Sequence, residues 1–211
     1  MNRIFVFLSA LLTFSTLFGQ KEMDLTSDST LITFFNENEI EGLKSMVQYV
    51  DDMVFNSTKE SDIDKAYHLF FEEMALAIEY KAPLEEEIKY QFLESLDSLI
   101  FNAIWRFEPH MNIIHYRDTV YRNLKNFKTL ELRPFGKYIN YLKEIGKDDS
   151  YFESLHKMFE DVGNLSASYS FSKDHKDFEF NIPKNRLWAA IYILRMEETY
   201  EMKLDRYFKN R

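Results

Sequence analysis

Three charged residues of this sequence fall inside apolar arcs when their segments are projected onto helices. They are Glu73, Arg117 and Arg195. Because an unpaired buried charge is too costly to keep, we expect Glu73 to meet Arg117 or Arg195 in the interior. Such a contact would be either a structural ion pair or the wall of a pocket for an anionic ligand. These three residues are therefore the candidate ligand-binding site.

The histidines do not have the spacing of a metal site. Glu153 and His156 share the E-x-x-H spacing of di-iron helical bundles, but the sequence lacks the second such pair that these sites need. Ser150 and Glu153 are better explained as a helix-capping box. His110 and His115 are five residues apart, which points them in different directions on a helix or a strand. The sequence therefore predicts no metal ligands.

Short catalytic motifs are also missing from the sequence. It has no G-x-S-x-G nucleophile motif, no cysteine and no glycine-rich phosphate loop. We accordingly assign no catalytic residue and no cofactor.

A basic stretch at residues 116–147 resembles a nucleic-acid channel in composition, because its bases alternate with aromatic residues. The basic residues are Arg117, Arg122, Lys125, Lys128, Arg133, Lys137, Lys143 and Lys147. Helical stripes account for most of the aromatic residues, however, and the whole chain has a net charge of −9. Nucleic acid is therefore not an expected partner.

Apolar residues that recur at intervals of three and four predict helices that would position these side chains. We expect the helices at about 36–55, 61–80, 83–106, from 109 onward, 134–146, 150–163 and 183–211. Pro83, Pro109, Pro134 and Pro183 fit helix starts, and Gly146 and Gly163 fit helix ends. Residues 187–194 are apolar on every side, so the last helix should be the most buried element.

Only one segment changes to a period of two. Apolar residues alternate with polar ones at 165–171 and again at 178–182, with a polar turn between them. The sequence therefore predicts a single all-α domain of six to seven helices at 36–211, with a small β-hairpin at about 165–182 before a buried C-terminal helix.

The N-terminus has the pattern of a secretion signal. Arg3 precedes an apolar stretch from Ile4 to Phe18, and the small residue Gly19 precedes polar Gln20. As a helix the stretch would span about 22 Å, which is short of the roughly 30 Å hydrocarbon core of a bilayer. We expect cleavage between Gly19 and Gln20, no stable membrane span afterwards, and a poorly ordered segment at residues 20–35.

Removal of residues 1–19 takes away one base, Arg3, and leaves 25 basic and 35 acidic residues, a net charge of −10. The absence of cysteine excludes a disulfide and a lipid attached to a cysteine, so the protein should be secreted or periplasmic and not a lipoprotein. Residues 20–100 have a net charge of −13 and residues 101–211 of +3, which favours closure of one half on the other or a basic partner for the acidic half.

Three functional hypotheses follow. The first is a non-enzymatic protein of the bacterial cell envelope or exterior that binds a protein partner or a small ligand. The second is an envelope hydrolase or transferase with a site near Glu73, Arg117 and Arg195. The third is a structural subunit of an envelope assembly. The oligomeric state and the identity of the partner are not encoded in any motif.

Overall fold

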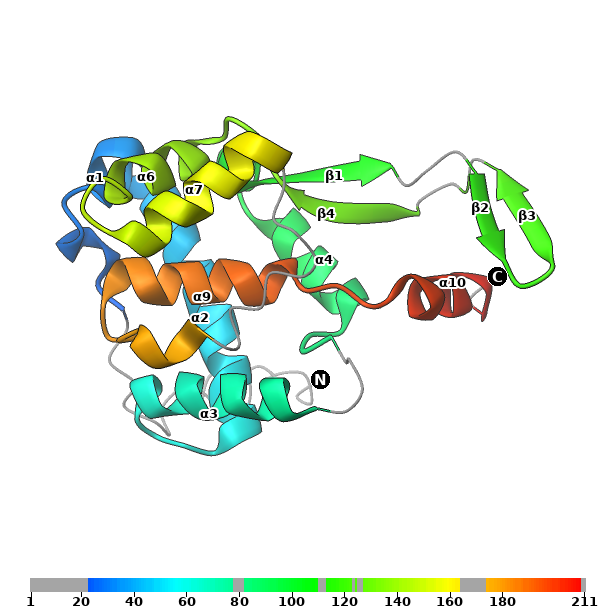
Figure 1. The fold of residues 1–211 in the computed structure, drawn as a ribbon, viewed down its shortest axis with the longest axis horizontal. Helices are drawn as coiled ribbons and strands as arrows, with labels where there is room; N and C mark the ends of the chain where they lie inside the picture. The colour runs from blue at the N-terminus through cyan, green and yellow to red at the C-terminus, as the bar shows by residue number, and fades with distance from the viewer. Residues whose placement is uncertain are drawn as a thin grey trace, which may run out of the picture.

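The computed structural model describes residues 23–77, 82–109, 113–122, 124, 127–163 and 174–209. Its helices are α1 (Leu31–Phe34), α2 (Glu37–Thr58), α3 (Ile63–Leu76), α4 (Glu86–Ser95), α5 (Ser98–Ile104), α6 (Lys137–Ile145), α7 (Ser150–Val162), α9 (Pro183–Arg195) and α10 (Tyr200–Lys209). Its strands are β1 (Trp105–Pro109), β2 (Ile113–Tyr116), β3 (Thr119–Arg122) and β4 (Lys128–Leu132), and the short 3₁₀ helices are η1 (Leu25–Ser27) and η2 (His175–Asp177). The predicted class, mostly α with a small β component, is confirmed (Figure 1).

The segment before α2 is ordered, contrary to prediction. Residues 1–22, which include the predicted signal and its cleavage site, lie outside the described residues. From Met23 onward the chain forms η1 and α1, and the side chains of Leu25 and Leu31 are fully buried. Asp28 accepts a hydrogen bond of 2.6 Å from the hydroxyl of Tyr141 on α6. Buried leucines and this contact fix a segment whose polar composition alone suggested poor order.

The helical body is built around α9, which packs against α2 (Figure 1). Every residue from Leu187 to Leu194 is buried, as the all-round apolar pattern predicts. Pro183 occupies the first turn of α9, and Asn36 caps α2 through a capping box with Glu39. The predicted last helix is wrong in its length, because α9 ends at Arg195 and a non-helical segment, 196–199, leads to α10.

Other predicted helix boundaries also need correction. The expected helix at 83–106 is two helices, because Asp97 caps a new one through a 2.7 Å hydrogen bond from the backbone N–H of Leu99. The N-cap of α7 is Asp149, which accepts from the N–H of Tyr151, and not the predicted Ser150. Phe135 lies within the helix predicted at 134–146, yet it precedes α6, has a φ of 60° and is 93% exposed.

The β-structure lies earlier in the chain than predicted. Residues 178–182 form no strand, and residues 164–173 lie outside the described part. Phe178 and Phe180 are instead packed into the core, where the ring of Phe180 stacks on Tyr67 with centroids 4.9 Å apart. The strands lie at 105–132, where β1 pairs with β4 and β2 pairs with β3, all antiparallel. The predicted helix from Pro109 is therefore wrong.

Strands β1 to β4, with residues 117, 118, 124 and 127, form an extension that we call the arm. Figure 1 shows the β1–β4 pair leading away from the helical body and the β2–β3 hairpin beyond it, with α10 alongside. A small apolar cluster lies apart from the main core. It consists of Ile114 on β2, Phe127 just before β4, and Leu204 on α10. The C-terminal helix α10 is thus partly covered by the arm.

Within the part of the chain that the structure describes, no helix combines the length and the apolar character that a membrane crossing requires.

An ion pair closed off from solvent connects the central helices. Arg186 on α9 donates from Nε to Oδ1 of Asp51 on α2 at 3.0 Å, and its Nη2 donates to Oδ2. The hydroxyl of Tyr67 on α3 donates to the same Oδ1 at 2.8 Å. The side chains of Asp51 and Arg186 are only 1% and 6% exposed. Burial raises the pKa of Asp51, and the hydrogen bond and charge of Arg186 oppose that shift.

Replacing Asp51 by asparagine should lower the free energy of unfolding by about 3 kcal/mol, because Arg186 would stay buried without a counter-charge. The matched control is Asp52→Asn on the exposed side of the same helix, which should change it by less than about 0.5 kcal/mol. Urea unfolding followed by circular dichroism measures both. Equal losses in the two variants would contradict the importance of the pair.

Candidate functional site

The structure does not bring the three predicted site residues together. Glu73 is exposed on α3. Arg117 lies in the turn between β2 and β3, where its side chain is 74% exposed and its Nη2 pairs with Oδ1 of Asp205 at 3.0 Å. Figure 1 shows α3 and the β2–β3 hairpin far apart, and Arg195 ends α9 in a half-buried position. The predicted interior pairing of Glu73 is therefore wrong.

The physical reason for that error is the arm. Ile113, Ile114, Val120 and Tyr121 lie at intervals that suit a helix, but they form the two strands of a hairpin. Arg117 therefore occupies a turn, with a φ of 51°, and not an apolar helical arc.

Two histidines come together although they are far apart in sequence. The Nδ1 atoms of His68 on α3 and His175 on η2 are 2.9 Å apart, so one ring must be neutral to accept the hydrogen bond. Burial lowers the pKa of His175, and the positive charge of His68 lowers it further. Across the described residues, no group of three or more His, Asp or Glu side chains has the arrangement of a metal site.

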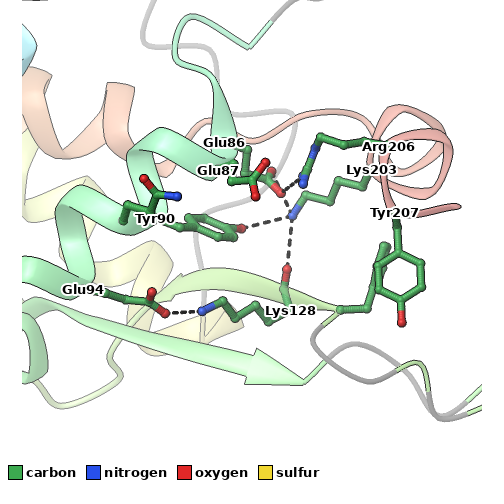
Figure 2. Close-up of a pocket in the computed structure, with 10 residues that line it drawn as sticks. Glu86, Glu87, Tyr90, Glu94, Lys128, Lys203, Arg206 and Tyr207 are labelled. Carbon is green, nitrogen blue, oxygen red and sulfur yellow. Dashed lines mark hydrogen bonds and ion pairs between the residues drawn. The ribbon is translucent and has the colours of Figure 1, made fainter. Parts of the chain in front are cut away.

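The strongest candidate site is a pocket of about 270 Å³ between α4, β4 and α10 (Figure 2). It is lined by Glu86, Glu87, Tyr90, Gln91, Glu94, Phe127, Lys128, Lys203, Arg206 and Tyr207. These residues combine carboxylates, cations and aromatic rings from segments more than a hundred positions apart.

Helix α4 supplies one wall of the pocket. Glu86 and Tyr90 are four residues apart and buried, whereas Glu87, Gln91 and Glu94 follow the neighbouring stripe and are exposed. The wall thus has a closed inner row and a solvent-facing outer row.

Lys203 of α10 is the centre of a buried ion network, and its side chain is 4% exposed. Figure 2 shows it reaching from α10 toward α4 and β4. Its Nζ lies 3.2 Å from Oε2 of Glu86 and donates to Oε2 of Glu197 at 2.8 Å. It also donates to the hydroxyl of Tyr90 at 3.3 Å and to the carbonyl oxygen of Lys128 at 3.5 Å. One ammonium group therefore joins α4, β4, α10 and the 196–199 segment.

Arg206, one turn further along α10, adds a second contact to the same carboxylate. Its Nη2 donates to Oε1 of Glu86 at 2.7 Å, and its Nε donates to Oε2 of Glu198 at 3.0 Å. The two oxygens of Glu86 face different cations, Oε2 facing Lys203 and Oε1 facing Arg206. The Glu86 side chain is 2% exposed, so both contacts lie in a nearly dry setting. Burial raises the pKa of Glu86, and the charge of Lys203 opposes that shift.

Polar groups behind the pocket hold the 196–199 segment in place. The Tyr90 hydroxyl donates to Oε1 of Glu197, which also accepts from the backbone N–H of Leu130 at 2.6 Å. Lys89 is fully buried and donates to the carbonyl oxygen of Met196 at 2.6 Å. Burial lowers the pKa of Lys89 to about 8.

Aromatic rings and a more exposed ion pair complete the pocket. The rings of Phe127 and Tyr207 meet edge to face, with centroids 5.6 Å apart. Lys128 forms an ion pair with Glu94, and its Nζ lies 3.7 Å from the centre of the Phe107 ring. The arrangement is suited to holding a charged group against a ring.

Sequence reasoning missed this pocket. Glu85, Glu86 and Glu87 are fully explained in sequence as acids at the positive end of a helix dipole, and the polar C-terminus looks like a solvated helix face. The available signal was the spacing of Lys203, Arg206 and Tyr207, which places two cations and a ring on one side of α10.

Comparison of the chain with protein-family models, with curated proteins and with solved structures found no match. The chemistry of the site must therefore be inferred from its own residues.

Replacing Glu86 by glutamine should lower the free energy of unfolding by about 2 kcal/mol, because Lys203 and Arg206 would lose a shared buried counter-charge. Glu85→Gln, an exposed change at the neighbouring residue, is the matched control and should have an effect below about 0.5 kcal/mol. Chemical unfolding monitored by tryptophan fluorescence measures the difference. A Glu86→Gln variant as stable as its control would show that the network contributes nothing to folding.

Proposed function

We propose that the chain is an exported, non-enzymatic binding protein of the bacterial cell envelope or exterior, and that the pocket between α4 and α10 is its binding site. The ligand is a small molecule or a side chain of a protein partner.

The observation that carries the proposal is the composition of the pocket. Its cations are already paired with carboxylates, with Lys203 and Arg206 on Glu86 and Lys128 on Glu94. Its described lining contains no serine, threonine, cysteine, histidine or aspartate, and Glu86, Glu94 and Lys128, which could act as general bases, are held in ion pairs. Preformed rings beside exposed carboxylates favour binding over group transfer.

The described residues do not form the cleft on which the enzymatic alternative was based. It required Glu73, Arg117 and Arg195 to line one cleft, and Glu73 and Arg117 lie on separate exposed surfaces. A structural subunit remains an alternative without a specific surface to support it.

Export is supported by the N-terminal sequence. Arg3, the apolar stretch to Phe18 and the small residue Gly19 give the order of a cleavable signal. The absence of cysteine leaves no site for a lipid anchor on that residue type. We infer a secreted or periplasmic location.

One preparation tests both parts of the proposal. The protein is expressed in a bacterial host with its first nineteen residues included. It should be recovered from the periplasm or the medium, and its measured mass should be that of a chain beginning at Gln20. The isotope-labelled product is then titrated with a fragment library that contains equal numbers of cations, anions and neutral molecules. Binding should shift the amide resonances of α4 and α10.

The Tyr207→Ala variant should bind the same fragments at least ten-fold more weakly, because it removes a ring of the pocket. Tyr116→Ala is the control, since Tyr116 stacks on Phe208 away from the pocket lining. Fragments that bind the Tyr207→Ala variant as well as the unchanged protein would contradict the site. An intact N-terminus in the cytoplasm would contradict export.

A further inference from the structure

We propose that the pocket between α4 and α10 binds a cationic group, an ammonium or a guanidinium, about the size of one amino-acid side chain. This inference rests on the proposed function and names the chemical class of the ligand.

The two cations of α10 that line the pocket are already engaged. Lys203 is shared between Glu86 and Glu197, and Arg206 is shared between Glu86 and Glu198. An anionic ligand would have to displace Glu86, which is buried, or Glu197 and Glu198, which are half-buried, and the displaced carboxylate would lose its cationic partner. That exchange is costly, so an anion is disfavoured.

The surroundings of the pocket carry more negative than positive charge. Five carboxylates line it or lie directly behind it, namely Glu86, Glu87, Glu94, Glu197 and Glu198. Four bases face them, namely Lys89, Lys128, Lys203 and Arg206. The excess is one negative charge, and the carboxylates of the outer row, Glu87 and Glu94, are the exposed ones. A cation entering from solvent therefore meets acids first.

This region already holds a cation, the ammonium of Lys128, against aromatic faces. Nζ of Lys128 lies 3.7 Å from the centre of the Phe107 ring and 5.5 Å from that of Tyr90. Two further rings belong to the lining, the half-buried Tyr207 and the buried Phe127 that it meets edge to face. Aromatic faces next to carboxylates are the usual surroundings of a bound ammonium or guanidinium.

The volume sets the size of the ligand. Pockets for drug-sized molecules have about 300–1,000 Å³, and the 270 Å³ here falls just below that range. A single lysine or arginine side chain, or a small free amine, fits this space.

The most exposed ion pair of the pocket, Lys128 with Glu94, is the one that an incoming cation can exchange with. The side chains of Lys128 and Glu94 are 30% and 50% exposed, so their pairing contributes little to stability. An incoming cation can take the place of Lys128 on Glu94 while the buried contacts of Lys203 stay intact. Lys128 is thus an internal competitor for the site.

The test compares two probes whose α-amine is acetylated, Nα-acetylargininamide with one positive charge and the neutral Nα-acetylcitrullinamide, abbreviated to argininamide and citrullinamide. Each is titrated into the protein that begins at Gln20, at low salt. Argininamide should bind at least ten-fold more tightly, and its affinity should fall as salt is raised. The double change Glu87→Gln with Glu94→Gln should weaken argininamide at least ten-fold. Glu73→Gln on α3 is the control and should not change it.

Lys128→Met supplies the sharpest arm of the test. It should tighten argininamide binding several-fold because it removes the internal competitor, whereas a site for anions would bind more weakly after the same change. A short peptide with one central arginine distinguishes a protein partner from a free amine, because only a partner's side chain would bind more tightly in peptide form.

Glutarate serves as an anionic probe. If citrullinamide or glutarate binds as tightly as argininamide, the ligand is not a cation, although the pocket is still a binding site. If argininamide shifts no amide resonance of α4 or α10, the proposal of a cationic ligand at this pocket is also overturned. Fragments of every class failing at this pocket would instead remove the proposed function itself.

Discussion

The carboxylate of Glu86 is the constraint on which the C-terminal part of the structure depends. It is buried, and its two oxygens hold Lys203 and Arg206, both from α10. Helix α10 turns its apolar residue Leu204 toward Ile114 of the arm and its Lys203 and Arg206 toward α4. Polar contacts across that second face keep α4 and α10 apart by the length of their side chains, and the pocket is the space that results.

A second buried ion pair has a different consequence. Asp51 and Arg186 lie within the helical body and are enclosed by α2, α3 and α9, so they fix the packing of helices and line no described pocket. The network of Lys203 reaches a solvent-accessible space and continues into the exposed pair of Lys128 and Glu94. The same chemistry is therefore architectural in the body and available to a ligand beside the arm.

The sequence was sufficient where one physical signal dominated. Apolar periodicity located α2, α6 and the buried α9, and Pro183 marked the start of α9 correctly. It failed at 113–122, where short apolar spacing suits a helix and a hairpin equally and where pairing between strands decides the outcome. The ion pair of Glu86 with Lys203 joins residues more than a hundred positions apart, and neither residue has an unusual sequence pattern around it. Only the tertiary fold could reveal it.

The claim that Glu86 holds α10 over α4 is tested most directly by a distance measurement between the two helices. The chain has no cysteine, so cysteines introduced at the exposed positions Ser95 and Glu201 can carry two unique spin labels. Pulsed electron paramagnetic resonance should give one narrow distance distribution, and Glu86→Gln should broaden it because the shared counter-charge is lost. A distribution already broad with Glu86 present, or one that Glu86→Gln leaves unchanged, would contradict the account.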